Sequence, residues 1–569
     1  MFCLKHIKEY LIRFLRLGVL VCIFFISPTE ALSSDYFVSK TGSDSNNGSQ
    51  SSPWATVQKA ANTVIAGDTV NVADGIQETT RVTINKSGTE QAPIIFKASG
   101  GSNAATTKGF TLGSNFPISY VTLRDFRIIN AIGKGIEVMC KGCVIENNYI
   151  EFSSDGGILI KSLATNVNGT VIVDNTSSSQ IIIKNNRLYR NAQFGIDVRG
   201  RNNLIEGNEV WDTIQHHPNR VPSPNWADAD GIHFHGSGHV FKNNYIHDIK
   251  FDGKYVINSH TDCFQTFQSS PLPYQEAASN IIFDGNRCFI PDYNSGIAAT
   301  NAFMLAKASN LIIKNNVIHA YGGINTGGGE NSNLIITNNT WIGLTNQTVL
   351  KNCQVGIECW PSGINLKNTP NVTIKNNIFY DHLYAPVIVD ATSNNSLVHS
   401  NNLMYRTDGK NWNADGLISS TGELWKINPK FINPSSVDYR LQNSSPAIDS
   451  GTNTGVSTDK DGITRPQGQG YDIGAYEYIG ETQPTSTSIP PTPTPIPPTL
   501  SPIPTPIPGD ITGPTGFSDN KVDMYDYNQL VSDFGKRGNP GFIKSDIVLN
   551  GRVNIFDFNV IITNFGKTQ

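Results

Sequence analysis

The residues best suited to chemistry in this sequence are acidic and histidine side chains gathered between positions 194 and 268. They fall in three short segments: FGIDVRG (194–200), DGIHFHG (230–236) and TDCFQTFQ (261–268). Aligned on Ile196, Ile232 and Phe264, each segment alternates apolar with polar residues. Because successive side chains of a strand point to opposite faces, this alternation predicts three strands that bury one face and turn the polar face outward.

If the three strands are parallel neighbours, their outward residues form two rows with a rise of about 4.8 Å per step. The first row contains Asp197, His233 and Gln265, and the second contains Arg199, His235 and Phe267. Asp230 and Asp262 occupy equivalent positions just ahead of two of the strands. The spacing therefore predicts one compact group of carboxylate, imidazole and guanidinium side chains.

Hydrolysis of a glycosidic bond is one reaction that such a group can perform. It requires a proton donor for the leaving oxygen and a carboxylate that activates water or attacks the sugar. Asp230 and Asp262, together with Asp197 and His233, are the candidate catalytic residues. Stacking fixes only the backbone spacing of adjacent coils, so the sequence leaves retaining and inverting chemistry open.

Elimination by a lyase is the alternative reaction. A base takes the proton next to a uronate carboxylate while cations neutralise that carboxylate. These roles suit Arg199, Lys161, Lys254 and the histidines, with calcium in the groove held by Asp197, Asp230 or Asp262.

Four insertions fall on the coils that carry these segments, at 161–180, 213–229, 249–261 and 269–280. Long loops on one side of a rigid scaffold commonly build a binding groove. The candidate substrate-binding residues are therefore Arg199, His235, Gln265 and Phe267, together with Trp226 and His260 from the loops. The plain alternative is that the outward Asp and His side chains are surface residues or turn formers.

A repeated strand-and-turn unit must position these residues. An apolar strand ends in a turn whose last Asn recurs at positions 148, 186, 208, 244, 286, 316, 339, 377 and 402. A second strand lies between successive markers, as in GIDV (195–198), GIHF (231–234) and GIEC (356–359). The short intervals of 22 to 25 residues predict an all-β parallel solenoid in which neighbouring coils bury a shared apolar stripe. Asn suits the turns because it tolerates the left-handed conformation.

The coils over residues 121–405 resemble the secreted right-handed parallel β-helix proteins, a fold that hosts several enzymes as well as adhesins. The motifs ADG (229–231) and TDC (261–263) resemble those of the polygalacturonases, which carry acidic residues ahead of the same strand in consecutive coils. This resemblance implies catalytic roles for Asp230 and Asp262. Thr261 replaces one family aspartate, and the family's later histidine and Arg-x-Lys motif have no clear match here.

Both ends of the solenoid have sequence signals of their own. A helix is expected from Pro53 to Ile65, where Trp54, Val57, Ala61 and Val64 share one face, and it would cap the first coils within residues 32–120. Residues 428–478 resemble the closing segment of many exported bacterial β-helix proteins. We therefore expect residues 406–480 to cap the other end.

The N-terminus predicts export. Four basic residues precede an apolar run from Leu17 to Ile26, and Thr29-Glu30-Ala31 follows, which is typical of a secretory signal peptide over residues 1–31. The run is short for a membrane span, and an uncleaved anchor is the alternative. The mature protein is then expected to be secreted, or associated with the cell surface, without a membrane span.

Six cysteines remain after the signal peptide, and the outside of the cell permits disulfide bonds. Close spacing favours the pairs Cys140–Cys143, Cys353–Cys359 and Cys263–Cys288. Connectivity does not follow from sequence alone.

A Pro/Thr-rich linker over 481–509 leads to an internal duplication, KVDMYDYNQLVSDFGK (521–536) and RVNIFDFNVIITNFGK (552–567). Oxygen-ligand positions of EF-hand-like calcium loops are occupied by Asp546, Asn550, Asn554 and Asp557, and in a less complete first loop by Asp519, Asp523 and Asp526. This small α-helical module, residues 510–569, resembles a dockerin, which implies bound Ca²⁺ and a cohesin-bearing scaffold protein as partner in a cellulosome-like assembly. A purely structural helix pair is the alternative.

The net charge of -4 and the charged fraction of 16% favour neither nucleic acid nor an anionic membrane as partner. Export, solenoid, clustered polar residues and docking module together predict a polysaccharide-degrading enzyme. Paired Asp residues favour a glycoside hydrolase, with a calcium-dependent uronate lyase as the alternative. A non-catalytic carbohydrate-binding or surface protein is a third class. The glycan, the disulfide connectivity and the oligomeric state stay open.

Overall fold

The computed structural model describes residues 33–98, 105–168, 170–215, 217–218, 228–249, 261–267, 276–290, 301–327, 329–344, 362–412 and 421–480. Several predictions of the sequence concern residues outside these ranges: the signal peptide, Trp226, Lys254, His260, the Cys353–Cys359 pair, the linker and the dockerin-like module with its seven calcium ligands between Asp519 and Asp557. The chain divides into two units, Met1–Glu481 and Thr482–Gln569, and the described residues belong to the first.

Three long sheets of parallel strands make up most of the described residues. Sheet 1 has the order β1 (Asp35–Val38), β2 (Thr69–Val72), β4 (Ile94–Ala98), β8 (Val121–Arg124), β12 (Val144–Glu146), β17 (Ile182–Lys184), β20 (Leu204–Glu206), β23 (Val240–Lys242), β26 (Ser279–Asp284), β29 (Ser309–Lys314), β32 (Ser332–Thr337), β35 (Val372–Lys375) and β38 (Val398–Ser400).

Sheet 2 has the order β5 (Thr106–Thr107), β9 (Arg127–Ile129), β13 (Tyr149–Glu151), β18 (Arg187–Tyr189), β21 (Glu209–Trp211), β24 (Tyr245–His247), β27 (Arg287–Ile290), β30 (Val317–Ala320), β33 (Thr340–Ile342), β36 (Ile378–Tyr380), β39 (Leu403–Tyr405) and β40 (Leu424–Trp425). Sheet 3 has the order β3 (Val82–Ile84), β6 (Phe110–Leu112), β10 (Ile136–Val138), β14 (Ile158–Ile160), β19 (Gln193–Val198), β22 (Ala229–Phe234), β25 (Phe264–Thr266), β28 (Asn301–Leu305), β31 (Gly322–Asn325), β34 (Ser362–Leu366) and β37 (Ala385–Val389).

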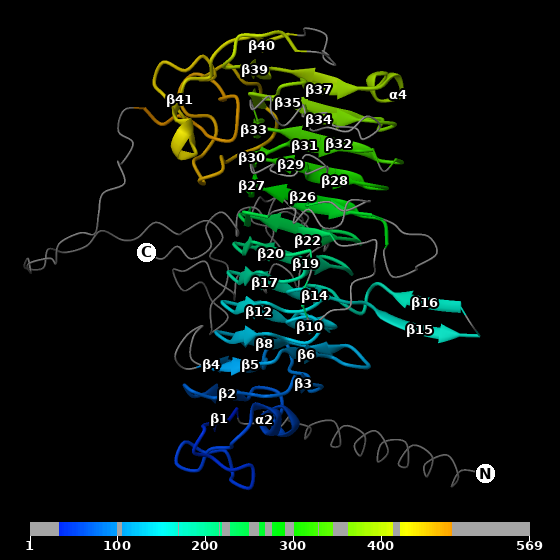
Figure 1. Ribbon diagram of the computed structural model, residues 1–569, viewed down its shortest axis with the longest axis vertical. Helices are drawn as coiled ribbons and strands as arrows, with labels where there is room; N and C mark the ends of the chain where they lie inside the picture. The colour runs from blue at the N-terminus through cyan, green and yellow to red at the C-terminus, as the bar shows by residue number, and fades with distance from the viewer. Residues whose placement is uncertain are drawn as a thin grey trace, which may run out of the picture. The chain divides into compact units, whose positions relative to one another are not determined.

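The chain visits the three sheets in turn, so each coil contributes one strand to each sheet, as β17, β18 and β19 do. Figure 1 shows the coils as successive rungs from β1 to β39. This arrangement confirms the predicted all-β parallel solenoid. The repeat GIEC (356–359) lies outside the described residues; β34 supplies the strand of sheet 3 between β31 and β37, with Ile364 in register with Ile324 and Val387.

A buried ladder of asparagines runs along the turn after sheet 1. It contains all nine Asn residues that marked the repeat: 148, 186, 208, 244, 286, 316, 339, 377 and 402. In each coil the side-chain oxygen accepts hydrogen bonds from the backbone N–H and the side-chain N–H of the preceding coil's Asn, as Asn286 does from Asn244 at 3.0 Å. The amide nitrogen also donates to a backbone carbonyl, for example from Asn286 to Phe241 at 2.8 Å. The ladder satisfies buried backbone groups at each turn.

Stacked phenylalanines fill the core beneath the candidate site. Phe241 stacks on Phe283 and Phe264 stacks on Phe303, each pair with ring centroids 4.9 Å apart. All four side chains are fully buried. Aromatic pairs of this kind add to the stability gained from buried area, so the strands of the site rest on a rigid base.

The first coils are closed by a short helix. Helix α2 (Val57–Thr63) begins after Thr56, whose side chain accepts a hydrogen bond from the N–H of Lys59, and it buries Val57, Ala60 and Ala61. The predicted helix is therefore present, although shorter than Pro53–Ile65. Among the described residues, no helix has the length and apolar character needed to cross a membrane.

Five more short elements lie outside the three long sheets before residue 431. Two of them pair as an antiparallel hairpin that leaves the stack after β14, namely β15 (Leu163–Val167) and β16 (Thr170–Asp174). Strands β7 (Ile118–Ser119) and β11 (Cys140–Lys141) pair in parallel, and helix α4 (Ala391–Asn394) follows β37. Figure 1 shows the hairpin projecting beside β14.

The segment from residue 431 to 480 packs against the outer face of sheet 2. It contains β41 (Phe431–Asn433), the 3-10 helix η1 (Pro434–Ser436) and β42 (Asp438–Leu441). The apolar contact consists of Val317, Ile342, Ile378 and Leu403 from the sheet and Phe431, Tyr439, Leu441, Ala447, Ile473 and Ala475 from the segment. The sequence predicted that residues 406–480 cap this end of the β-helix. Within that range, residues 431–480 lie along the side of several coils, where Val317, Ile342, Ile378 and Leu403 turn apolar side chains towards them.

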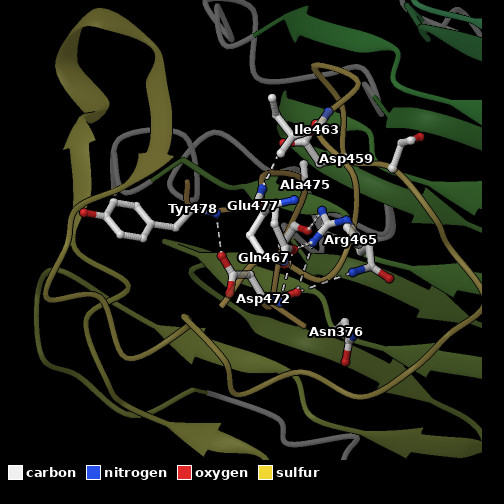
Figure 2. Close-up of polar contacts among 12 residues, drawn as sticks. Asn376, Asp459, Ile463, Arg465, Gln467, Asp472, Ala475, Glu477 and Tyr478 are labelled. Atoms are coloured by element: carbon white, nitrogen blue, oxygen red, sulfur yellow. Dashed lines mark hydrogen bonds and ion pairs between the residues drawn. The ribbon is translucent and has the colours of Figure 1, made fainter. Parts of the chain in front are cut away.

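A buried polar cluster holds this segment together (Figure 2). Arg465 and Glu477 form an ion pair at 2.5 Å, and neither side chain is exposed. Arg465 also donates to the carbonyl of Asp472 at 3.3 Å. The Asp472 carboxylate accepts from the N–H of Tyr478 at 2.6 Å, and that of Asp459 accepts from the N–H of Glu477 at 2.9 Å. These aspartates are engaged in fixing turns.

Candidate functional site

Strands β19, β22 and β25 bring the three sequence segments together. Asp197 pairs in register with His233, and His233 pairs with Gln265, so the predicted first row exists. Ile196, Ile232 and Phe264 lie on the opposite face and are fully buried in the core. Alternation along the strands was thus sufficient to find the row.

The second predicted row, Arg199, His235 and Phe267, lies beside the first. The rings of His235 and Phe267 meet edge to face with centroids 5.0 Å apart. Arg199 reaches back to the first row, where its Nη2 is 2.7 Å and its Nε 3.3 Å from the carboxylate oxygens of Asp197. The two rows therefore form one connected group.

The ion pair with Arg199 keeps Asp197 charged. Burial by itself would raise the pKa of Asp197, but the charge and hydrogen bonds of Arg199, with His235 and His233 nearby, lower it to about 2. Two of the five guanidinium N–H donors are used by this pair. The remaining donors of Arg199 can face a ligand, since a fifth of its side chain (21%) is exposed.

His233 and Asp230 form a buried dyad at the centre of the site. Nε2 of His233 is 2.8 Å from Oδ2 of Asp230. Burial by itself would lower the pKa of His233, but the hydrogen bond and charge of Asp230, with the charges of Asp197 and Asp228, raise it above its ordinary value. Because Nε2 faces the carboxylate, Nδ1 is the ring nitrogen left to exchange a proton with a ligand.

Asp230 and Asp262 are both fully buried, and each carboxylate ties one coil to the next. Oδ1 of Asp230 accepts a hydrogen bond from the N–H of Asp262 at 2.6 Å. Oδ1 of Asp262 in turn accepts from the N–H of Asn301 at 2.8 Å. The sequence placed both residues ahead of their strands. Asp262 does precede β25, but Asp230 is the second residue of β22, and the sequence did not reveal that their oxygens bind backbone groups.

Two further residues belong to this site. Phe194 packs against the ring of His233 with centroids 5.3 Å apart, and Phe267 contacts the other side at 5.5 Å. Asn301 donates its backbone N–H to Asp262 and so occupies, one coil further along, the position that Asp230 and Asp262 occupy in their coils. Both were missed, although alignment on the inward residues would have found them: Phe194 pairs with Asp230, and Asn301 stands two residues before Phe303 as Asp262 stands before Phe264.

Two other histidines of these coils, His235 and His239, are neutral at neutral pH. Burial lowers the pKa of His235 to about 3 and that of His239 to about 4. His239 accepts from the N–H of Asn203 at 3.2 Å and its other nitrogen is 2.9 Å from the carbonyl of His235, so its role is structural. Of these three histidines, only His233 has a pKa that is raised above its ordinary value.

The carboxylates of the site do not suit a calcium ion. Asp197 is bound to Arg199, and Asp230 is bound to His233 and to a backbone N–H. The parts of the chain that the structure describes contain no group of three or more His, Cys, Asp or Glu side chains arranged to hold a metal. We therefore derive no step through calcium in the groove.

Two disulfide bonds support these coils. Cys263 in the strand region between Asp262 and Phe264 is bonded to Cys288 of β27, with Cα atoms 6.1 Å apart, and Cys140 is bonded to Cys143. Both pairs were favoured by spacing, and both are confirmed. The first bond fixes the third strand of the site to sheet 2 of the next coil.

Comparison with known families gives a match over the first half of the β-helix. Residues 36–270 match the family described as Pel9A-like, right handed beta helix region. The domain is a right-handed parallel β-helix. The matched residues include Asp197, Asp230, His233 and Asp262. No curated protein matches the sequence.

Solved structures with similar coils share little sequence with this chain. Pectate lyase Pel9A has 17% identity and a TM-score of 0.44, with 78% of this chain and 96% of that chain covered. XylC in complex with xylose has 12% identity and a TM-score of 0.46, with 78% and 98% covered. The GH136 lacto-N-biosidase from Eubacterium ramulus has 14% identity and a TM-score of 0.38, with 65% and 68% covered. At these scores the likenesses assign no activity.

Proposed function

We propose that this protein is a secreted enzyme that cleaves polysaccharides at the group formed by β19, β22 and β25. The proposal rests on the site itself: a histidine held by a buried carboxylate, beside an arginine with donors to spare. The family match over residues 36–270 supports it, because that family takes its name from Pel9A, which is described as a pectate lyase. The N-terminal sequence supports export.

The geometry favours a lyase over the hydrolase that the sequence suggested. Hydrolysis by paired carboxylates needs both groups at the sugar. Asp230 and Asp262 are fully buried, and their Oδ1 atoms accept hydrogen bonds from backbone N–H groups of the next coil. His233 and Arg199, by contrast, are of the types that elimination from a uronate requires, namely a base and a fixed cation.

In the proposed elimination, Nδ1 of His233 takes the proton from the carbon next to the uronate carboxylate. The electrons of that C–H bond form a carbon–carbon double bond, and the glycosidic C–O bond breaks with its electron pair on the leaving oxygen, which takes a proton from water. Asp230 orients the ring and stabilises the imidazolium that forms. Arg199, fixed by Asp197, binds the uronate carboxylate.

Hydrolysis remains the second candidate because of one observation. The pKa of His233 is raised and that of Asp197 is lowered to about 2, in adjacent coils. Opposite shifts of this kind can define an acid and a carboxylate that work together. In that reaction His233 would protonate the leaving oxygen and Asp197 would activate water.

One assay separates these reactions. The protein is incubated with pectic, alginate, glycosaminoglycan and xylan substrates, and ultraviolet absorbance and new reducing ends are followed together. Elimination raises both, whereas hydrolysis raises reducing ends alone. His233→Ala should abolish either activity, and His399→Ala, which removes a histidine paired with Glu423 far along the stack, should not. If no substrate is cleaved, the proposal is overturned and the protein is better described as a binding or surface protein.

We propose in addition that the C-terminal module, residues 510–569, binds Ca²⁺ and docks the enzyme on a cohesin-bearing scaffold. The support is the duplicated sequence, with oxygen ligands at the expected loop positions. Removal of calcium by a chelator should increase proteolysis of this module and leave cleavage of soluble substrate unchanged. Identical proteolysis with and without the chelator would contradict the calcium assignment.

A further inference from the structure

Sheet 2 carries a second unusual surface, outside the proposed site. Its outward positions form two rows in register along β13, β18, β21, β24 and β27. One row contains Tyr149, Arg187, Glu209, Tyr245 and Arg287, and the other contains Glu151, Tyr189, Trp211, His247 and Phe289. We call these ten residues the aromatic face. Five of the ten carry large aromatic rings and a sixth is a histidine.

The rings of this face stack along the solenoid. Trp211 lies between Tyr189 and His247, with centroids 5.1 and 5.9 Å away and near-parallel planes. The guanidinium of Arg187 is 5.2 Å from the Trp211 ring and 6.0 Å from that of Tyr149. Stacking holds each large side chain in one orientation, so little entropy would be lost when a ligand binds.

Three of the four charged side chains of the aromatic face are already paired, and the fourth, Arg287, lies 4.6 Å from the ring centroid of Tyr245. Arg187 binds Glu209 at 2.8 Å, and Glu151 binds Arg127 of the neighbouring coil at 3.1 Å. His247 lies 3.3 Å from the same Glu209. A charged polymer would have to break these pairs to bind. The face is therefore matched to a neutral partner that offers hydroxyl groups to paired guanidinium and carboxylate groups.

The rings also keep polar atoms for a ligand. Within the described residues, the hydroxyls of Tyr149, Tyr189 and Tyr245 and the indole N–H of Trp211 make no hydrogen bond, while Arg187 exposes 58% of its side chain. Tyrosine and tryptophan are common at binding surfaces because they present an apolar body with a polar tip.

The remainder of sheet 2 shows what a protein partner requires. Where residues 431–480 cover the sheet, the first row continues as Val317, Thr340, Ile378 and Leu403, and the second as His319, Ile342, Tyr380 and Tyr405. Rings therefore occur in the second row on both sides of the boundary. The first row changes, from tyrosine, arginine and glutamate in the aromatic face to largely aliphatic side chains that pack against the segment. The change in composition at the edge of the covered region argues against a second protein segment and for a polar, uncharged ligand.

We propose that the aromatic face binds a chain of neutral polysaccharide, extended along the solenoid and independent of the cleavage site on sheet 3. The repeat of about 4.8 Å between coils offers equivalent contacts to successive units of a linear polymer. Such a surface would hold the enzyme on a neutral glycan of the matrix that surrounds its substrate. The inference does not depend on the proposed cleavage.

The test is binding of the full chain to soluble neutral polymers, hydroxyethyl cellulose, glucomannan and xylan, by affinity electrophoresis and calorimetry, with polygalacturonate for comparison. Trp211→Ala should weaken binding of at least one neutral polymer by tenfold or more. Because this variant can fail to fold, a triple Tyr149→Phe, Tyr189→Phe, Tyr245→Phe variant keeps the rings and removes the hydroxyls, and it should weaken binding at least threefold. Binding should not depend on salt concentration.

Two controls make the result decisive. Phe116→Ala removes an aromatic side chain that is 51% exposed elsewhere on the solenoid, and it should bind as the native protein does. His233→Ala should lose cleavage and keep binding, which separates this inference from the proposed function. The inference is overturned if no neutral polymer binds, if the folded variants bind equally well, or if binding is confined to polygalacturonate and disappears with salt.

Discussion

The dyad of His233 and Asp230 can be tested by Asp230→Asn, a substitution of nearly equal volume. Oδ1 of Asp230 accepts the N–H of Asp262 at 2.6 Å, and Oδ2 lies 2.8 Å from Nε2 of His233. If the new amide oxygen faced His233, the amide nitrogen would face the backbone N–H of Asp262. Two donors would then face each other, and the unsatisfied buried donor would cost about 1–3 kcal/mol of stability. The amide nitrogen should therefore face His233.

That orientation changes the tautomer of the histidine. The amide nitrogen donates to Nε2, so the ring proton moves to Nδ1, the atom that must accept a proton from the substrate. Loss of a positioned base lowers rates by about 10²–10⁴-fold. Replacing a charge-assisted hydrogen bond by a neutral one should cost about 1 kcal/mol of stability, so the variant should fold.

The pH profile gives an independent readout. Asp230 raises the pKa of His233, so its removal should lower that pKa and move the corresponding limb of the profile to lower pH. For elimination the native rate should rise as pH passes the raised pKa, because the base must be neutral, whereas for hydrolysis with His233 as the acid it should fall. Asp248→Asn is the matched control, since Asp248 binds Nδ1 of His247 at 2.7 Å with 57% of its side chain exposed.

The comparison needs kcat and kcat/KM on a soluble oligosaccharide across the pH range, with unfolding measured in parallel. Asp248→Asn should stay within about twofold of the native rate, because a solvated carboxylate contributes little to its neighbour. A native rate and profile in Asp230→Asn would refute the role assigned to the dyad. Equal losses in both variants would show that the effect is not specific to the site.

Three further predictions concern stability. Asn286→Ala should lower the unfolding free energy by about 2–4 kcal/mol in denaturant titrations, because it leaves buried groups of Asn244 without hydrogen-bond partners. The control Asn310→Ala, at an exposed position, should have little effect. Equal effects of the two substitutions would contradict the role of the ladder. The pKa of Asp197 is about 2 in the folded protein against an ordinary value of 3.8, and this difference should contribute about 2 kcal/mol to the free energy of unfolding. The contribution is present above pH 4 and is lost as pH falls towards 2. Asp197→Asn should remove this pH dependence of stability. Arg465→Met should lower the free energy of unfolding by about 3–5 kcal/mol, because it leaves Glu477 and its neighbours without their cation. Arg440→Met, at a partly exposed ion pair, should lower it by less than about 1 kcal/mol. A small loss in Arg465→Met would mean that backbone N–H groups alone stabilise the cluster.

Local patterns in the sequence determined the architecture of this protein. Alternation along Ile196, Ile232 and Phe264 fixed which side chains face outward, and the structure places Asp197, His233 and Gln265 in the predicted row. The recurring Asn marked the turns, because its buried side chain bonds backbone groups in every coil, while the residue just before it, Asn or Gly, takes the left-handed conformation. Such features repeat with the period of the fold, so they are visible without coordinates.

Only the tertiary structure decided what the site residues do. Asp230 is the second residue of β22 and Asp262 lies just ahead of β25, where the direction of a side chain depends on how neighbouring coils approach. The carboxylates that looked like a catalytic pair bind the backbone of the next coil, and one of them holds His233. The pKa values of His233 and Asp197 likewise follow from burial and from charges that adjacent coils contribute. Strand periodicity sets which residues meet, but hydrogen-bond partners and burial are properties of the packed coils, and these determine the chemistry.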